Sequence, residues 1–484
     1  MNKNYIEHKG KVIKKDKHFS HVMAITLDPR SYNRIGVLRC ITSRTGDLLI
    51  NHTDRSKLYL IKGKNLEHFE ITKPLIIKNE DKIIKSLTKK DWDFIGLEDP
   101  DIWIDENTGL MHLYFTIPIK PNLKGERIKI HLGHAEGKDL SSLVMTKPIL
   151  LANDKYSAKE VSIAPLNKKG FRYNLVESRD YKKGLSYSTI QVAIAHDMGK
   201  PWTYGKIAFH PAKHNMKWIE RDASPGPLLP KSFIDIGEGK LVGIINGREG
   251  NKTIAKKIKR GTFSVGIFIY DYEKGKIDWV SKKPFIQDSE AEIITFASQF
   301  VETGKGKGIL YAHVDDSFVR AYTLEAEKLR KLLPKDFVFL NPGKLIDNDL
   351  ELVLVKMVPA NEEKGYVPAY FFEMKNTDNG EKMGRIDLRV GNNKSIYYGG
   401  NIGYTVEEKF RGHHYAGRSL KLLFPFMKKH KVNSLLITCN PENIASRKTC
   451  EFTGGKLLEI VDLPESNDQY KNGERKKCIY KFDL

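Results

Sequence analysis

Short apolar runs, separated by turn residues, fill the chain from about residue 18 to residue 345. Runs such as VMAITL, MHLYFTI and FSVGIFIYDY are bounded by glycine, proline, asparagine or aspartate. Runs of this length predict β-strands, and long amphipathic helical patterns are scarce. Many short strands are typical of a sandwich, a barrel or a propeller. Groups of three or four strands with aromatic residues favour a propeller of about five blades.

The pattern changes at about residue 350. The runs LVLVKMVPA, YVPAYFFEMK and GRIDLRVG predict further strands, and the segment PGKLIDNDLE before them is a candidate linker. With 484 residues the chain is too long for one ordinary hydrophobic core. We therefore expect an N-terminal extension at residues 1–17, an all-β propeller at 18–345 and a second domain at 350–484.

The segment NIGYTVEEKFRGHHYAG, residues 401–417, stands out in the second domain. Its apolar strand is followed by a basic, glycine-containing turn and then by the helix-like run SLKLLFPFMKKH. The first turn of a helix has unpaired N–H groups and the positive end of the helix dipole, so it favours a phosphate. Gly412 permits a close approach of the backbone, and Arg411 adds a full positive charge. The segment thus predicts an anion site.

This segment resembles the acyl-CoA-binding motif of the GNAT N-acetyltransferases, Arg/Gln-x-x-Gly-x-Gly/Ala after a strand. Arg411 and Ala416 match its ends, and His414 stands where the family usually has glycine. The downstream ITCNPENIASRKTCEFTGG is similar to the family's next strand and helix. The resemblance implies an α/β fold with acetyl-CoA, or another acyl-CoA, as cofactor. It implies these cofactor-binding residues: Ile402, Tyr404, Val406, Arg411, Gly412, His413, His414, Tyr415, Ala416, Gly417, Asn443 and Ser446.

Acyl transfer to an amine needs a neutral amine and a proton source for the leaving thiolate. The tyrosine that often serves as the acid in this family falls at Cys450 here, which we expect to be a core residue. Replacement acids or bases are Asp387, Tyr404 and Glu407. Asp387 is the first choice because a lone carboxylate in an apolar strand needs a reason, although an outward-facing position is the alternative.

The first domain carries a second resemblance. The sequence FIGLEDPDIWIDENTGLMHLYFT resembles a blade of glycoside hydrolase family 130, the mannoside phosphorylases and related five-bladed propeller enzymes. Four more segments follow in the family's order: KEVSIAPLNKKGFRYNLVE, ERDASPGPLLPKSF, FSVGIFIYDYEKGKIDWVSKKPFI and YAHVDDSFVRAYTL. The last places Asp315 on the family's aspartate. The resemblance implies a propeller whose central funnel binds a glycoside.

Glycoside cleavage needs a proton donor, commonly a carboxyl group. The resemblance implies that Asp99 is this general acid; a turn-forming Asp-Pro pair is the alternative. Asp101 replaces the arginine of the family's Glu-Asp-Pro-Arg, which argues against phosphorolysis. The residues expected to bind the sugar or an anion are Glu98, Lys159, Glu160, Arg179, Arg221, Asp222 and Asp315.

Composition adds limits. The formal net charge of +21 favours anionic ligands, but the lysines are dispersed and no nucleic-acid motif accompanies them. The four cysteines form no CxxC pair, and His413 and His414 have no third ligand nearby, so no metal site is predicted. We expect a cytoplasmic protein, because the N-terminus lacks the apolar region of a signal peptide and no apolar run approaches membrane-spanning length.

Together these patterns predict an acetyl-CoA-dependent N-acyltransferase fused to a glycosidase-like propeller. An amino sugar or an amine-bearing glycoside would give both domains one substrate. In one alternative the propeller is an active glycoside hydrolase or phosphorylase and the GNAT-like domain is accessory. In another the propeller is a non-catalytic module that binds sugar or docks a partner. The front of the GNAT-like domain is short, so we expect the propeller to supply much of the acceptor pocket.

Overall fold

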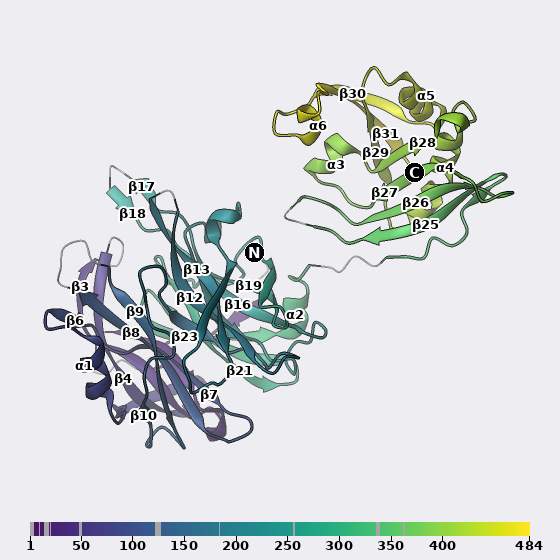
Figure 1. Cartoon of the computed structure of the whole chain (residues 1–484). Coiled ribbons are helices and arrows are strands. Elements are labelled where there is room, and N and C mark those ends of the chain that lie inside the picture. The colour runs from purple at the N-terminus through teal and green to yellow at the C-terminus, as the bar shows by residue number, and fades with distance from the viewer. Residues whose placement is uncertain are drawn as a thin grey trace. The chain divides into compact units, whose positions relative to one another are not determined.

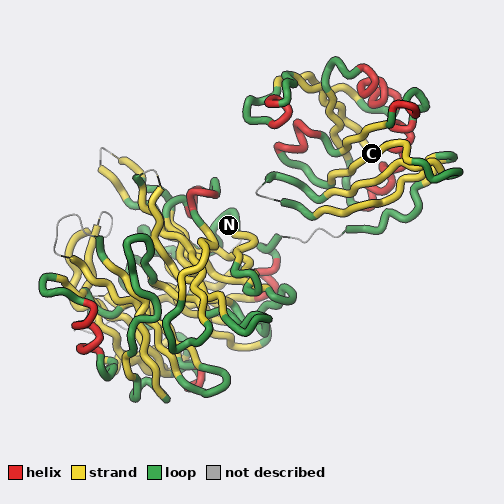
Figure 2. The backbone as a smooth tube through the Cα atoms, in the orientation of Figure 1, coloured by secondary structure: helices red, strands yellow, loops and turns green. Residues whose placement is uncertain are grey.

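The computed structural model describes the chain except for residues 1–3, 9, 14–18, 20, 48–50, 122–126, 183, 255–256, 335–338 and 362–363. The chain divides into two compact units, Met1–Pro334 and Lys335–Leu484. Strands dominate the first unit, and strands and helices alternate in the second (Figures 1 and 2). Among the described helices, none has the length and apolar character needed to cross a membrane.

The first unit is a five-bladed propeller of antiparallel blades, of which the third and fourth are joined in one eight-stranded sheet by a single parallel residue pair. The first blade is β2 (His21–Leu27), β3 (Ile35–Asp47), β4 (Asn51–Asn65) and β5 (His68–Pro74). The second is β6 (Trp92–Phe94), β7 (Glu98–Ile104), β8 (Met111–Pro121), β9 (Lys129–Gly137) and β10 (Val144–Met145). The third is β11 (Lys159–Ser162), β12 (Arg172–Lys182), β13 (Leu185–Ala195) and β14 (Thr203–Phe209). The fourth is β15 (Asp222–Leu228), β16 (Lys240–Arg248), β19 (Phe263–Asp271) and β20 (Lys276–Val280).

The fifth blade joins the two ends of the propeller. It contains β21 (Thr295–Gly304), β22 (Lys307–Val314), β23 (Phe318–Glu325) and β1 (Tyr5–Glu7). Strand β1 pairs with β23, with Tyr5 opposite Leu324. The expectation that residues 1–17 form an extension outside the propeller is therefore corrected, because β1 completes the last blade. The division between the units also falls earlier than residue 345.

Smaller elements connect these strands. They are β17 (Lys252–Ile254) and β18 (Lys257–Lys259), the helices α1 (Glu80–Leu87) and α2 (Ala326–Arg330), and the short 3-10 helices η1 (Pro29–Ser31), η2 (Pro211–Lys213) and η3 (Lys217–Ile219). Blade strands such as β8 are buried on both faces, since each blade packs between two others. Burial on both faces explains why MHLYFTI is continuously apolar instead of alternating.

The second unit contains two sheets around one hydrophobic core. The first sheet runs β24 (Ile346–Asp347), β25 (Leu350–Val358), β26 (Ala369–Asn376), β27 (Lys382–Arg389) and β28 (Ile402–Val406). The second sheet runs β29 (Ser434–Cys439), β31 (Lys476–Asp483) and β30 (Lys456–Asp462). The helices are α3 (Lys394–Gly399), α4 (Tyr415–Lys429), α5 (Ile444–Phe452) and α6 (Asp468–Lys471), with the 3-10 helix η4 (Glu408–Phe410) before α4. Leu420, Leu423 and Phe426 of α4 pack in the core with the strands.

Candidate functional site

One strand in each of the first three blades, namely β2, β7 and β11, has a bulge at an equivalent point. Ala24, Asp99 and Glu160 have φ values of 45°, 48° and 49°, in the left-handed region that non-glycine residues rarely adopt. The strand register shifts at each of these residues. A β-bulge redirects a side chain and is common beside functional sites. The bulges on β7 and β11 bring Asp99 and Glu160 to one pocket.

Arg39 of β3 joins the first blade to the carboxylates of the second. Its Nη1 lies 2.9 Å from Asp99 Oδ1, and its Nη2 lies 2.6 Å from Glu98 Oε1. Burial alone would lower the pKa of Arg39, but Glu98 and Asp99 raise it above its ordinary value. Burial raises the pKa of Glu98 to about 7, against the opposing effect of Arg39. Asp99 thus has a cationic partner at close range.

Glu160 has a contrasting environment. Burial, and then the charge of Asp99, raise the pKa of Glu160 well above its ordinary value. Burial alone would lower the pKa of the neighbouring Lys159, but the surrounding carboxylates, led by Glu177 at 3.6 Å, together raise it above its ordinary value. Two nearby carboxyl groups therefore differ in environment: Asp99 is paired with Arg39, whereas no cation forms an ion pair with Glu160 in the described part of the chain.

Two adjoining pockets surround these residues. The first, of about 320 Å³, is lined by Arg39, Glu98, Asp99, Glu160 and Asp316, among others. The second, of about 260 Å³, is mainly cationic and polar. Its charged lining residues are Lys159, Glu177, Arg179, Arg221, Asp222, Arg248 and Arg260. Lys159, Arg179 and Arg260 line both pockets, so the two form one continuous site.

Positive charge is incompletely balanced in the second pocket. Burial, and then the charge of Arg248, lower the pKa of Arg260. Arg248 forms an ion pair with Asp222, and Arg221 stacks 5.0 Å from the ring of Tyr187. Within the described part of the chain, Arg260 has no carboxylate partner. Crowded cations without enough carboxylates are the electrostatic signature of an anion site.

The aspartate pair between β22 and β23 divides into two roles. The carboxylate of Asp315 accepts hydrogen bonds from the backbone N–H groups of Glu292, Ile293 and Ile294, at 2.8, 3.0 and 2.8 Å. These contacts engage it in holding a loop, and it does not line either pocket. Asp316 lines the first pocket, where burial is outweighed by His313, His52 and Arg39, which lower its pKa. The sequence prediction chose Asp315, and its neighbour occupies the pocket instead.

In the second unit, β28 and β29 are edge strands of two different sheets, no β-ladder pairs them, and we call this unpaired junction the wedge. They are joined at one end by Asn401, whose backbone N–H donates to the carbonyl of Leu436 at 2.6 Å. Its side-chain oxygen accepts from the Leu436 N–H at 2.8 Å, and its amide donates to the carbonyls of Arg389 and Gly391. Beyond Asn401, β28 is a sheet edge with unpaired backbone groups. A wedge of this kind can hold an extended amide-bearing chain.

The predicted phosphate turn follows the open end of β28. Residues 411–414 are exposed, and Gly412 and His414 have φ values of 87° and 61°. His414 is the N-cap of α4, and no side chain caps this helix end. The first N–H groups of α4 are thus available to an anion. Arg411 donates from Nε to the carbonyl of Val406 at 3.2 Å, which ties the turn to β28.

The next predicted cofactor residues belong to the start of α4. Tyr415, Ala416 and Gly417 are buried. The Tyr415 hydroxyl donates to Asp349 at 2.5 Å, so this side chain anchors α4 to the β24–β25 turn. A Cβ added to Gly417 would lie 3.1 Å from Thr453, which leaves little room between α4 and the end of α5. His413 is exposed beside Tyr415, with ring centroids 6.0 Å apart.

Tyr404 connects β28 to α5. It faces the same core as Ile402 and Val406, and its hydroxyl lies 2.8 Å from the Ser446 hydroxyl. Burial raises the pKa of Tyr404 above its ordinary value. Burial also raises the pKa of Cys450 to about 12, and Cys450 is fully buried, as expected. The Tyr404 hydroxyl therefore lies near Cys450, the residue that occupies the position of the tyrosine acid in the GNAT resemblance.

The remaining predicted residues of this unit differ in accessibility. Asn443 is the N-cap of α5, and its side chain accepts from the Ser446 N–H at 3.0 Å. Asp387 of β27 is partly buried and lies 2.8 Å from Arg389 Nε. Burial raises the pKa of Asp387, while Arg389 opposes this rise. Glu407 is exposed at the end of β28.

A larger pocket, of about 890 Å³, lies within the second unit. Its lining includes the aromatic residues Tyr366, Phe371 and Tyr398 together with Arg389. Arg389 is adjacent to the Asn401 end of the wedge, because its N–H bonds the carbonyl of Asn401 at 2.7 Å. We expected the propeller to supply much of the acceptor pocket, yet this unit contains a large pocket of its own.

Sequence reasoning missed four residues that shape these sites: Arg39, Arg260, Asp316 and Asn401. Arg260 ends the basic run KKIKR, which is compatible with a solvated surface. Asn401 opens the segment that we singled out, but a strand-start asparagine has no special signal. Arg39 acts on partners 59 and 60 residues away, beyond the reach of a local motif.

Known proteins give further context. A family model described as an acetyltransferase (GNAT) domain matches residues 340–456. No curated protein matches the chain. Among solved structures, beta-1,2-mannobiose phosphorylase from Listeria innocua is 14% identical, with a TM-score of 0.48 over 68% of this chain and 99% of that chain. MPT-4, a mannose phosphorylase from Leishmania mexicana, is 13% identical, with a TM-score of 0.41 over 69% and 92%.

The acetyltransferase MccE, a microcin C7 self-immunity protein solved with acetyl-CoA and AMP, is 18% identical, with a TM-score of 0.20 over 24% of this chain and 61% of that chain. Identities and scores at this level carry no functional argument. The propeller assignment rests on the five blades of the sheet topology and on the ordered sequence resemblance. The second unit contains a GNAT acetyltransferase domain and the first is a propeller resembling glycoside hydrolase family 130, so the chain is an enzyme that joins these two folds.

Proposed function

We propose that this enzyme transfers an acetyl group from acetyl-CoA to the amine of an amino sugar or amine-bearing glycoside. The observation that carries the proposal is the wedge between β28 and β29, which opens beside the uncapped start of α4. The wedge offers backbone groups to an extended chain, and the helix start offers N–H groups to a pyrophosphate. Acetyl-CoA, when bound, supplies a thioester carbonyl. The residues around the turn 411–417 would hold its phosphates.

Tyr404 is the proposed proton donor to the leaving thiolate. Its raised pKa keeps the hydroxyl protonated, and the Ser446 hydroxyl 2.8 Å away orients it. Asp387 is the proposed partner of the amine. It lies opposite Gly403 in the sheet, next to β28, and Arg389 links it to the lining of the large pocket. Glu407 is exposed at the mouth and is a second candidate base.

The acceptor class follows from the large pocket in the second unit. Tyr366, Phe371 and Tyr398 supply aromatic faces of the kind on which the apolar faces of sugar rings stack. Arg389 and Lys394 supply donors for hydroxyl or acidic groups. A volume of about 890 Å³ is in the range of small-molecule sites. A small polar acceptor with a ring fits these features better than a long peptide.

A second candidate function is glycosyl chemistry in the propeller, and the contrast between Asp99 and Glu160 favours it. The raised pKa of Glu160 suits it to the role of general acid, whereas Asp99 forms an ion pair with Arg39. This assignment gives Glu160 the general-acid role that the sequence resemblance implied for Asp99. The adjoining pocket, with Lys159, Arg179 and Arg260, can hold phosphate or a sugar phosphate.

One experiment separates these functions. The full chain is incubated with acetyl-CoA and a panel of amino sugars, amine-bearing glycosides, neutral glycosides with phosphate, and peptides, and CoA release and product masses are measured. Acetylated amino sugar, lost in Tyr404→Phe but kept in Glu160→Gln, supports the first function. Cleavage of a glycoside, lost in Glu160→Gln but kept in Tyr404→Phe, supports the second. CoA release with peptides alone would overturn the proposed acceptor.

A further inference from the structure

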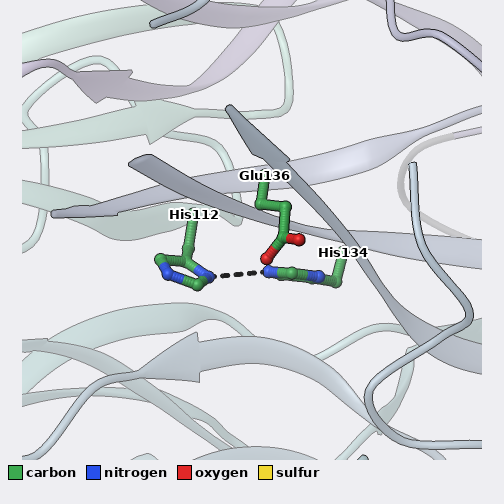
Figure 3. A group of neighbouring side chains, drawn as sticks. All are labelled: His112, His134 and Glu136. Atoms are coloured by element: carbon green, nitrogen blue, oxygen red, sulfur yellow. Dashed lines mark hydrogen bonds between the residues drawn. The ribbon is translucent and has the colours of Figure 1, made fainter. Parts of the chain in front are cut away.

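The second blade contains a buried cluster that neither proposed reaction uses. His112 of β8 and His134 and Glu136 of β9 lie together (Figure 3). His112 Nδ1 is 2.9 Å from His134 Nε2. One potential ligand atom from each of the three residues lies within 4.8 Å of the others. None of the three lines the pockets around Asp99 and Glu160, so the cluster is separate from that site.

The hydrogen bonds around His134 fix its tautomer. Its Nδ1 lies 2.8 Å from the Thr146 hydroxyl oxygen, and this hydroxyl donates to the carbonyl of Lys147 at 3.0 Å. With its proton directed at Lys147, the Thr146 hydroxyl accepts from the Nδ1–H of His134. The lone pair of His134 is then on Nε2 and accepts from the Nδ1–H of His112, so a metal that bound both of these nitrogens would replace this hydrogen bond, with the His112 proton moved to Nε2 of the same ring. A histidine that ligates a metal is usually held in this way, through its other ring nitrogen.

The charges of the cluster also suit a cation. Within the described part of the chain, no side chain forms an ion pair with Glu136. Two imidazoles beside a carboxylate without an ion-pair partner offer nitrogen and oxygen donors of the kind that bind transition metals.

A loop from the third blade closes over this cluster. A Cβ added to Gly199 would lie 2.9 Å from Glu136 Oε2, 3.5 Å from His112 Cε1 and 3.7 Å from Asp197 Oδ1. Asp197 accepts from the Gly199 N–H at 2.9 Å and pairs with Lys200 at 3.0 Å. Asp197 is thus a nearby carboxylate on a different blade, reachable if it exchanges Lys200 for a cation.

We propose that His112, His134 and Glu136 bind a divalent transition metal, with Zn²⁺ as the ion that best matches the donors. Two imidazoles and one carboxylate are a common three-residue zinc set, and a water or Asp197 would complete a tetrahedron. Adjacent ligands of zinc lie roughly 3.3 Å apart, so the two imidazole nitrogens need to separate by only a few tenths of an ångström. A metal held by Asp197 as well would join the second blade to the third.

The other candidate group in the described residues is His52, Asp54 and Asp316. It is a weaker metal site because its two carboxylates already have protein partners. Arg44 binds both carboxylate oxygens of Asp54, each at 2.7 Å. His313 lies 3.2 Å from Asp316. This second group therefore serves as a matched control.

The test uses the full chain, without an affinity tag, after treatment with a chelator. Zn²⁺ binding is measured by calorimetry, and Co²⁺ binding by the visible absorption of its tetrahedral complex. We expect one bound ion per chain and a higher Tm with Zn²⁺ than with the chelator. Glu136→Gln and His112→Gln should each weaken binding at least about tenfold. His52→Gln should not change it.

Glu136 is partly exposed, so its substitution keeps the test valid if His112→Gln does not fold. Thr146→Val adds a check on orientation and should weaken binding by about tenfold, because it removes the acceptor that fixes the His134 tautomer. Absence of saturable Co²⁺ absorption would overturn the proposal. So would binding that His52→Gln abolishes and Glu136→Gln leaves unchanged.

Discussion

The hydroxyl of Tyr404 on β28 lies 2.8 Å from the hydroxyl of Ser446 on α5 in the second unit. Cys450 is buried on the same helix, at the place where the GNAT resemblance puts a tyrosine. The strand therefore supplies a hydroxyl near the point where the helix lacks one. This relationship makes Tyr404 the strongest candidate acid of the acetyl transfer.

We predict that Tyr404→Phe lowers kcat by about a hundredfold or more, since general acid catalysis commonly contributes factors of 10² to 10⁴. KM for acetyl-CoA should change little, because the ring keeps its packing. Initial rates of CoA release across a range of acetyl-CoA concentrations measure both constants. Tyr397→Phe is the matched control, since Tyr397 is a tyrosine of α3 whose hydroxyl bonds Glu459 at the surface. Equal kcat values for the two variants would remove Tyr404 from the mechanism.

Arg260→Ala tests the anion pocket of the propeller. The guanidinium of Arg260 has no carboxylate partner in the described part of the chain. We therefore expect it to pair with the phosphate group of a bound ligand. A charge-assisted hydrogen bond contributes about 1.5 to 3 kcal/mol, which corresponds to roughly a 10- to 100-fold loss of affinity. Calorimetry with inorganic phosphate and with a hexose phosphate measures this loss.

The neighbouring Lys259→Ala is the control for that experiment, because Lys259 is exposed on β18 and does not line the pocket. It changes the net charge by the same amount. If both substitutions weaken binding equally, and the effect disappears at high salt, the anion is attracted by the general positive charge of the protein and not by a site.

Much of the fold follows from sequence patterns. The short apolar runs predict the strands of the propeller, because burial on one or both faces imposes an alternating or continuous apolar pattern on each strand. The GNAT-like motif predicts the strand, turn and helix beside the wedge. The expected N-terminal extension was corrected because β1 pairs with β23, more than 300 residues away. No local pattern encodes a pairing of that kind.

The details of the sites were harder to predict. Asp99 and Glu160 reach the same pocket because bulges in two separate blades redirect them, and a bulge has no clear sequence signal here. Asp315 and Asp316 are neighbours in one turn with φ values of 49° and 48°, so backbone geometry alone decides which carboxylate faces the pocket. His112 and His134 are 22 residues apart and meet only because β8 pairs with β9. The sequence therefore has no recognisable spacing of metal ligands at these positions.

His414→Gly tests the departure of the phosphate turn from the GNAT pattern. His414 has a φ of 61°, which costs a non-glycine residue about 1 to 2 kcal/mol. Glycine removes this strain together with the side chain. It also removes the stacking of His414 on Phe452, with ring centroids 5.0 Å apart, and it increases the conformational entropy of the unfolded chain. We expect little net change in stability and a several-fold tighter Kd for CoA by calorimetry.

His413→Gly is the control, because His413 is also exposed in the turn but has no positive φ. It should bring no gain in CoA affinity. A weaker Kd in His414→Gly would indicate that the imidazole contacts the cofactor directly, and the strained conformation would then serve binding.

Asp101→Asn tests how burial acts on a carboxyl group of β7. Burial raises the pKa of Asp101 to about 7, and Asp101 lies opposite Tyr114 in the second blade. The unfolded chain releases this proton near its ordinary pKa of about 4, so the folded protein binds it more tightly. The wild type therefore loses stability as the pH rises from about 4 to about 7 and loses no more above that range. Asparagine is neutral throughout.

At pH 4.5 the free energies of unfolding of Asp101→Asn and the wild type should be similar. At pH 8 the variant should be more stable by about 2 kcal/mol, less than the full linkage value because Asp101 is partly exposed. Urea unfolding at the two pH values measures the difference, and Asp154→Asn, at an exposed aspartate, should show none. A difference that is the same at both pH values would mean that folding does not raise the pKa of Asp101.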